Sequence, residues 1–416
     1  MDTATAVDPA EMGMNRSRLD AIPQFFDDRY ISKGKLPCMA TLVARGGEIV
    51  HEAYRGTTHL AGDGVPIGPE SIFRIYSMTK PVTSLAGMML IEAGDLRLDH
   101  NVSRYIPEFA GIRVWAGGDL DTYETQAPER EINIRDLFLH TSGLTYAFLH
   151  QHEVDGLYRR ENLGTFANSS EISLKTLCER LAALTLLFSQ VARWNYGHST
   201  DVIGRVIVVV SGQALDVFLQ DQIFAPLGMT STGFHVPEAQ IDRLTTCYAK
   251  DPLSGETSLF DGAGGATGLF KDPPVWINAG GGLVSTPRDF LAFCQCLLNG
   301  GRLGSSRLIS PKTWEFMGLN HLPGGATLRD MGDRTFSESR MEGAGFGLGG
   351  SVIVDVAASG QAGSLGTFSW GGLANTFFWI DPVEDLIAIQ MTQMMPSGCY
   401  PIRPQFNALV YAAIDG

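Results

Sequence analysis

Extended segments stand at both ends of this 416-residue chain, and mainly helical ones fill its middle. Near the N-terminus, apolar runs at 40–44 and 48–54 flank Arg45-Gly46-Gly47, whose two glycines favour a hairpin turn. Short extended runs return in the C-terminal part, at 346–356, 367–370, 375–380 and 386–391. We therefore predict an α/β fold of the α+β type. Residues 1–95 and 237–416 would form one discontinuous α/β domain, residues 96–236 an inserted helical domain, and the active site would lie in the cleft between them.

Several helices and one loop are expected from local patterns. The helices are predicted near 15–29, 172–187, 202–210, 286–299 and 404–414, and a Gly-, Asp- and Glu-rich loop near 116–130. The run at 202–210 is rich in β-branched residues, so periodicity alone does not decide between helix and strand there. The helix at 286–299 has the clearest ends, because Thr286 can cap it, Pro287 suits its first position and Asn299-Gly300-Gly301 can stop it.

Composition restricts the partners. The formal charge of −14 argues against nucleic acid or an anionic membrane surface, since either would need a basic patch, and small neutral substrates fit better. The N-terminus shows no signal-peptide pattern, and the longest β-branched run, 206–210, is far shorter than the roughly 18 apolar residues of a membrane span. Six cysteines in a chain of this length favour free thiols in a reducing cytoplasm. We expect a cytoplasmic protein without metal or organic cofactor, and the sequence leaves a homo-oligomer open.

The main chemical signal is Ser77-Met78-Thr79-Lys80. A Ser and a Lys three residues apart on a helix share a face, so the amine can activate the hydroxyl. The extended run 72–76 leads in, Pro81 suits a first turn, an apolar stripe follows, and Gly94 is placed to end the helix. Ser77 would thus lie at a helix N-terminus, where unpaired N–H groups stabilise developing negative charge.

The alternative for this tetrapeptide is an ordinary capping serine followed by a solvated lysine. A second Ser-x-x-Lys, at Ser32-Lys33-Gly34-Lys35, lies in a polar stretch with no site around it, so the pattern alone is weak. Three further stretches decide in favour of Ser77. They stand in the order 137–144 (Leu-Phe-Leu-His-Thr-Ser-Gly-Leu), 193–201 (Arg-Trp-Asn-Tyr-Gly-His-Ser-Thr-Asp) and 366–372 (Gly-Thr-Phe-Ser-Trp-Gly-Gly).

With these four stretches the chain resembles the serine β-lactamase and penicillin-binding-protein superfamily across nearly its whole length. Within it the chain is most similar to the group of class C β-lactamases, family VIII carboxylesterases and the fungal statin-pathway acyltransferase. The resemblance implies an antiparallel sheet flanked by helices. It also implies Ser77 as nucleophile, Lys80 as its activator, Tyr196 as partner in the general-base role, and the backbone N–H groups of Ser77 and Leu373 as oxyanion hole. A Lys ammonium beside the phenol would favour the phenolate, so a proton could move within the triad.

The departures from the β-lactamase pattern indicate the substrate class. His198 stands where β-lactamases have the Asn of Tyr-x-Asn, and Trp370 and Gly371 replace the cation and hydroxyl that hold the β-lactam carboxylate. We expect Trp370, Gly371, Gly372 and His198 to contact the substrate. Desolvating a carboxylate without a partner is costly, whereas neutral short-chain esters can lie on an indole face. Alternatively, Trp370 only packs its strand, and Arg74 or another cation reaches the carboxylate.

Other signals carry little weight. Gly345 to Gly350 matches Gly-x-Gly-x-x-Gly, but it runs into a strand pattern and not into a helix, which argues against a dinucleotide site. His150-Gln151-His152-Glu153 could suggest zinc, although no further ligand cluster accompanies it. Cys294 and Cys296 are expected to pack within a helix.

The sequence therefore predicts a serine carboxylesterase that hydrolyses short-chain carboxylic esters through an acyl-enzyme on Ser77. The alternatives are an acyltransferase of the statin-pathway type, in which an alcohol replaces water, and a β-lactamase with weak cephalosporin hydrolysis. A penicillin-recognising module that is acylated without turnover is the rival from another class.

Overall fold

A computed structural model describes residues 7–61, 64–163, 172–262, 268–332 and 336–416. Its main sheet has seven strands in the order β12-β13-β14-β15-β16-β1-β2, and every neighbouring pair is antiparallel. The N-terminal strands β1 (Cys38–Arg45) and β2 (Glu48–Gly56) form the expected hairpin. They join the C-terminal strands β12 (Ala344–Phe346), β13 (Ser351–Ile353), β14 (Phe368–Gly371), β15 (Phe377–Asp381) and β16 (Leu386–Met391). The prediction that both ends of the chain build one helix-flanked antiparallel sheet is confirmed.

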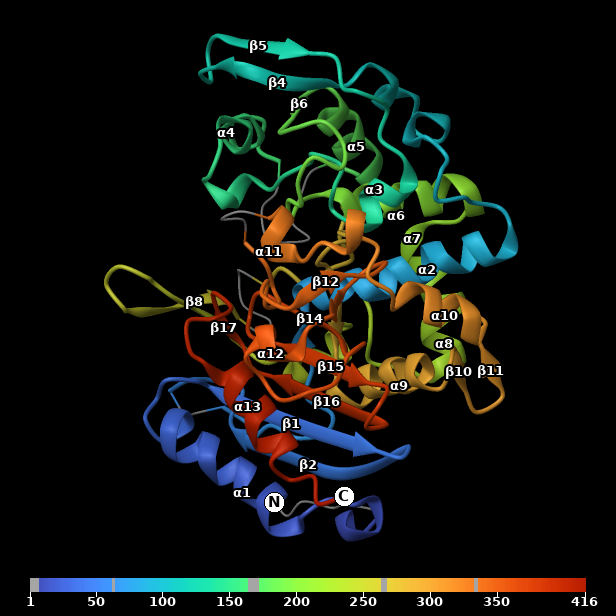
Figure 1. Ribbon diagram of the computed structural model, residues 1–416. Coiled ribbons are helices and arrows are strands. Elements are labelled where there is room, and N and C mark those ends of the chain that lie inside the picture. Colours follow the sequence, from blue (N-terminus) through green and yellow to red (C-terminus); the bar gives the residue numbers. More distant parts are fainter. Residues whose placement is uncertain (1–6, 62–63, 164–171, 263–267, 333–335) are drawn as a thin grey trace.

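Alternation along the strands buries both faces of this sheet. Met39 and Val43 of β1 pack against α1 (Arg16–Phe26) and α13 (Ile402–Tyr411), whereas Ala40 and Leu42 belong to the larger core that includes α9 (Pro287–Leu298). Figure 1 shows the blue hairpin beside the red C-terminal strands, with the cyan and green middle of the chain at the other end of the molecule. The helices expected near 15–29, 286–299 and 404–414 are confirmed, and Thr286 caps α9 by accepting from the N–H of Asp289.

Residues 96–236 contain both helices and strands. The helices are α3 (Ile134–Phe138), α4 (Glu153–Arg160), α5 (Leu174–Ala182), α6 (Ser199–Ser211), α7 (Leu215–Leu219) and α8 (Ala225–Leu227). A three-stranded sheet of β4 (Arg113–Gly118), β5 (Tyr123–Gln126) and β6 (Thr185–Leu186) accompanies them. The β-branched run at 202–210 is thus helical. The division of the chain into two domains stays a prediction.

Three local predictions are wrong. The loop expected at 116–130 contains the hairpin β4-β5, whose turn is held by Asp119 accepting from the N–H groups of Asp121 and Thr122. The helix expected at 172–187 ends at Ala182, and β6 follows. The single strand expected at 346–356 is interrupted between β12 and β13, where Gly349 adopts a φ of 115° that a side chain would strain. The first and third differences arise at turns, which composition alone does not locate.

Smaller elements complete the fold. They are β3 (Phe73–Arg74), β7 (Cys247–Lys250), β8 (Thr257–Asp261), β9 (Val284–Ser285), β10 (Arg302–Leu303), β11 (Ser306–Arg307), β17 (Met394–Met395), α10 (Pro311–Met317), α11 (Leu328–Met331) and α12 (Val356–Ser359). No single helix of the described chain is long and apolar enough to cross a membrane, and only α6 with the bent segment 215–227 passes that test as a pair. All six cysteines are free, as expected, and Cys294 and Cys296 are buried in α9.

Candidate active site

The helix α2 (Thr79–Ala93) positions the predicted nucleophile. The strand β3 ends at Arg74, and a short 3-10 turn over Tyr76–Met78 carries Ser77 directly into α2. The extended lead-in therefore ends two residues earlier than expected, with Tyr76 at a φ of 42°. Gly94 ends the helix at a φ of 86°, as predicted. Because α2 is buried over most of its length, Ser77 stands on a rigid support.

Lys80 lies one turn beyond Ser77 and is only 2% exposed. Its Nζ donates to Ser77 Oγ at 3.3 Å and to the carbonyl oxygen of Gly280 at 2.7 Å. Burial lowers the pKa of Lys80 to about 7, and the negative charges of Asp201 and Glu338 oppose this decrease only in part. A large fraction of Lys80 is therefore a neutral amine near neutral pH, within hydrogen-bond distance of the hydroxyl that it would deprotonate.

Tyr196 lies in the loop that leads into α6. It packs against Lys80, whose Nζ is 4.4 Å from the centre of the phenol ring. Burial raises the pKa of Tyr196 well above its usual value, although hydrogen bonds with Ser77 and Trp370 oppose the increase. The expectation that the Lys80 ammonium favours a phenolate is therefore wrong, because burial and, after it, the negative charge of Glu338 raise the pKa of the phenol. The phenol keeps its proton, and the amine is the basic member of the pair.

Ser77 and Tyr196 border a hollow of about 480 Å³, its open mouth included, and Lys80 lies behind them. Ser77, Tyr196, His198 and Leu373 line it, so the structure brings together the predicted nucleophile, the predicted oxyanion donors and one expected substrate contact. The other lining residues are Tyr76, Tyr146, Phe148, Trp276, Asn278, Gly280, Gly281, Phe336 and Glu338.

The Trp370-Gly371-Gly372 stretch lies behind this wall. Trp370 is fully buried and donates its indole N–H to the Tyr196 hydroxyl at 3.3 Å. It therefore positions Tyr196, and it is not among the residues that line the hollow. At Gly372 an added Cβ would lie 2.2 Å from the carbonyl oxygen of Ile75, and at Gly371 it would lie 2.7 Å from the guanidinium of Arg403. Gly372 thus permits close approach of the chain after β14 to the turn that carries Ser77, and Gly371 leaves room for the Arg403 guanidinium.

His198 is 1% exposed and its orientation is fixed by Asp201, because Nδ1 lies 2.8 Å from Asp201 Oδ2. Its Nε2 is buried and has no hydrogen-bond partner among the described residues. His198 therefore offers a polar atom beside the hollow that a substrate group or water can use.

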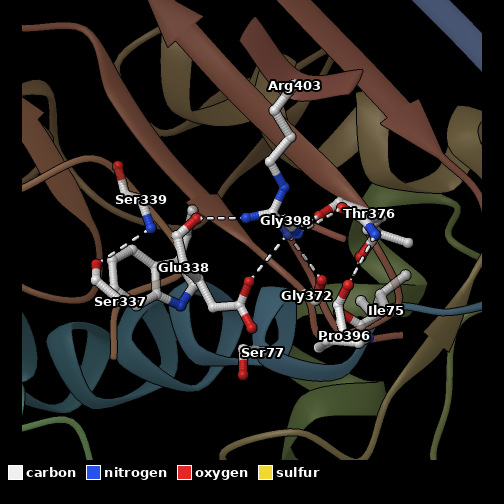
Figure 2. A network of polar contacts seen from close by, with 12 residues as sticks. Ile75, Ser77, Ser337, Glu338, Ser339, Gly372, Thr376, Pro396, Gly398 and Arg403 are labelled. Carbon is white, nitrogen blue, oxygen red and sulfur yellow. Dashed lines mark hydrogen bonds and ion pairs between the residues drawn. The ribbon is translucent and has the colours of Figure 1, made fainter. Parts of the chain in front are cut away.

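Sequence reasoning missed Glu338 and Arg403. Glu338 is 1% exposed, and Arg403 on α13 donates to its carboxylate at 2.9 Å and to its backbone oxygen at 2.7 Å. Arg403 also donates to the carbonyl oxygens of Gly372 and Thr376, at 2.8 and 3.1 Å. Figure 2 shows the Glu338 carboxylate between Arg403 and Ser77. In the sequence, Glu338 and Arg403 lie outside the four recognised stretches, and no spacing pattern connects them to those stretches.

The alternatives set aside from sequence have structural explanations. Arg74 is fully buried and paired with Asp261 at 2.5 Å, and it does not line the hollow, so it is not the cation that would hold a substrate carboxylate. Residues 32–35 at the second Ser-x-x-Lys are exposed. His152 caps α4 by accepting from Val154 N–H, and the described residues contain no group of three or more side chains suited to a metal ion.

The comparisons with known proteins agree with this geometry. A family model described as Beta-lactamase matches residues 18–412, which is nearly the whole chain. The chain belongs to the beta-lactamase family. An uncharacterized protein of Mycobacterium tuberculosis is 35% identical over 80% of each chain, and Esterase EstB of Burkholderia gladioli is 27% identical over 99% of this chain and 100% of its own. Among solved structures, EstCE1, "a hydrolase with promiscuous acyltransferase activity", superposes with a TM-score of 0.78 at 24% identity, over 96% of this chain and 99% of its own.

Within the beta-lactamase family, these relatives place the chain near esterases and confirm the expected fold. Together, the family model and the likeness to Esterase EstB support a serine hydrolase.

Proposed function

We propose that this chain is a serine carboxylesterase of the family VIII type that acts on short-chain esters without a carboxylate group. The observation that carries the proposal is the buried Lys80 amine, with its pKa near 7, 3.3 Å from Ser77 Oγ. A nucleophile activated by an adjacent base is the requirement for acyl-enzyme chemistry.

The residues suggest the following sequence of steps. Neutral Lys80 accepts the Ser77 proton as Oγ attacks the ester carbonyl, and the N–H groups of Ser77 and Leu373 stabilise the oxyanion. Tyr196 passes its proton to the departing alkoxide and regains one from the Lys80 ammonium. Water then attacks the acyl-enzyme with the same groups acting in reverse, which releases the acid and restores Ser77.

Charge in the hollow argues against penicillins. Its described lining includes the carboxylate of Glu338 and no Lys or Arg side chain. A substrate carboxylate would lose water there without gaining a cationic partner, which costs several kcal/mol. We expect nitrocefin to be hydrolysed weakly if at all. A specificity constant comparable to that for p-nitrophenyl acetate would restore the β-lactamase interpretation.

Acyl transfer to an alcohol is the second candidate, and the printed description of EstCE1 favours it. The same catalytic groups serve both reactions, so the partition depends on whether water or an alcohol occupies the hollow. Adding short alcohols to a p-nitrophenyl butyrate assay and measuring butyrate ester against butyric acid separates the two.

The test of the proposal is hydrolysis of p-nitrophenyl butyrate by wild-type protein and by Ser77→Ala. We expect sustained turnover in the wild type and its loss in the variant, with Ser32→Ala as the matched control at the second Ser-x-x-Lys. Full activity in Ser77→Ala would refute the assignment of the nucleophile. A single stoichiometric burst without turnover would instead indicate a penicillin-recognising module.

A further inference from the structure

The hollow beside Ser77 has a wall made largely of aromatic rings. Tyr146 stacks on Phe148 with ring centres 5.0 Å apart, and Phe336 lies 6.3 Å from Phe148 and 6.0 Å from Tyr196. Trp276 and Tyr76 line the same hollow. Ring faces carry partial negative charge, and a compact cation placed over several of them is attracted to each.

One nitrogen of the protein already lies over two rings beside the hollow. Lys80 Nζ lies 4.4 Å from the ring centre of Tyr196 and 5.4 Å from that of Tyr146. When Lys80 is protonated, both ring faces attract its ammonium group, so rings of this wall lie at distances at which they can hold a cation. A purely apolar substrate would gain only burial from the same rings.

The acidic group of the hollow lies at this aromatic wall. Glu338 is two residues from Phe336, and one of its carboxylate oxygens accepts from Arg403 behind the wall. Figure 2 shows the carboxylate between Arg403 and Ser77. Its charge reaches across the hollow, since it opposes the decrease that burial causes in the pKa of Lys80 and adds to the increase that burial causes in the pKa of Tyr146 and Tyr196. The ion pair of Glu338 and Arg403 is neutral overall, yet its negative end faces the hollow.

An alternative explanation is that the rings only fill space and that Glu338 only anchors Arg403. Packing alone would be served by aliphatic side chains, and it does not require a carboxylate on the inner surface, where removal from water is costly. Aromatic faces together with one carboxylate are the elements by which proteins hold quaternary and protonated amines.

We propose that the hollow contains an ammonium subsite, formed by Glu338 and the rings of Tyr146, Phe148, Trp276 and Phe336, which selects esters that carry a compact cationic group near the ester carbonyl. This inference rests on the proposed esterase function and specifies its substrate class. The overall charge of −14 adds a general attraction for cationic substrates.

The experiment uses pairs of esters with equal shape and different charge. Choline butyrate is compared with 3,3-dimethylbutyl butyrate, which places the charge in the alcohol. Methyl 4-(trimethylammonio)butyrate is compared with methyl 5,5-dimethylhexanoate, which places it in the acyl chain. We expect kcat/KM to favour the cationic member of at least one pair by about tenfold or more. Equal values within both pairs would overturn the proposal.

Variants assign the preference to this wall. Glu338→Gln keeps the shape and can still accept from Arg403, and it should reduce the cationic preference severalfold. Phe336→Leu, which keeps an apolar group but removes the ring, should reduce it as well and provides the test if Glu338→Gln does not fold. Glu342→Gln is the matched control, because Glu342 is 59% exposed. A preference unchanged in both Glu338→Gln and Phe336→Leu would contradict the assignment.

Two measurements keep this proposal separate from the esterase proposal. Loss of p-nitrophenyl butyrate turnover in Ser77→Ala tests the esterase function alone. Calorimetric titration with tetramethylammonium chloride tests the subsite without any reaction. Binding to the wild type that weakens in Glu338→Gln would support the subsite even if no ester were hydrolysed, and absence of binding together with equal kcat/KM values would refute it.

Discussion

Two buried basic side chains, six residues apart in the sequence, have different environments. Arg74 is 0% exposed and paired with Asp261, and it also donates to the carbonyl oxygen of Thr245. Lys80 is 2% exposed, and in the part of the chain that the structure describes no carboxylate lies within 4.0 Å of its amine. Its partners are the neutral oxygens of Ser77 and Gly280. A buried basic group with a counter-ion thus keeps its charge, whereas burial without a counter-ion lowers the pKa of the group, so that it loses its proton more easily.

This difference explains why the two positions need different residues. The arginine guanidinium keeps its proton in any protein environment, so it suits a permanent ion pair between β3 and β8. A lysine amine can be made neutral by removal from water, so it suits a base beside a nucleophile. The proposed catalysis depends on leaving Lys80 unpaired.

The largest expected effect is that of Lys80→Met on activity. Loss of a positioned base should decrease kcat/KM for p-nitrophenyl butyrate about 10²- to 10⁴-fold. Lys80→Arg should be equally inactive, because a guanidinium does not give up its proton near neutral pH. Appreciable activity in Lys80→Arg would contradict the contrast with Arg74, because a permanent cation beside Ser77 would then be enough for catalysis.

Lys80→Met should also increase the stability of the folded protein. The folded-state pKa of Lys80 lies below its unfolded value, so the unfolded chain binds more protons between about pH 7 and 10.5, and wild-type stability rises through that interval. The cost of burying Lys80 is therefore fully present below pH 7. Lys80→Met should have the higher free energy of unfolding at pH 7, and the difference should shrink by pH 10. Denaturant unfolding at both pH values measures this, and a constant difference would contradict the lowered pKa.

Arg74→Met should act on stability. Removal of the guanidinium leaves the Asp261 carboxylate buried without its ion-pair partner, which costs about 3–5 kcal/mol. Arg16→Met, at an ion pair with Asp8 in which both side chains are about half exposed, is the matched control and should cost about 0–1 kcal/mol. Chemical denaturation compares the two variants. Equal costs would show that burial does not distinguish these pairs.

The sequence predicted most of the fold and the contact between Ser77 and Lys80, because both depend on local patterns. Hairpin glycines, a capping Thr286 and the Ser77-Lys80 spacing are read within a few residues. Glu338, Arg403 and Asp261 were not predicted, because their roles arise only when distant segments meet at β14 and β3. The direction of the Tyr196 pKa was wrong for a related reason, since a sequence shows charge but not the extent of burial.

Tyr196→Phe should reduce activity less than Lys80→Met, because the phenol relays a proton that the amine supplies. If the two groups act as one unit, the double variant Lys80→Met/Tyr196→Phe should be little worse than the poorer single variant. Specificity constants of all four proteins give the coupling. Losses that simply multiply would show that the groups act independently.

Trp370→Phe should have the smallest effect. It removes the N–H that holds the Tyr196 hydroxyl while keeping an aromatic side chain in the core, and one neutral hydrogen bond is worth about 1 kcal/mol. We expect kcat/KM to fall by less than about tenfold for neutral and cationic esters alike. A selective loss for one class of ester would show that Trp370 touches the substrate after all.

The central claim is that Lys80 is neutral for a large part of the time near pH 7. Lysine side chains labelled with ¹³C and ¹⁵N can be titrated by NMR, and the Lys80 signal is identified by its absence in Lys80→Met. The structure predicts that the Lys80 signal titrates near pH 7. A Lys80 signal that titrates near the reference lysine pKa of about 10.4 would contradict the account, because the amine beside Ser77 would then remain protonated at neutral pH.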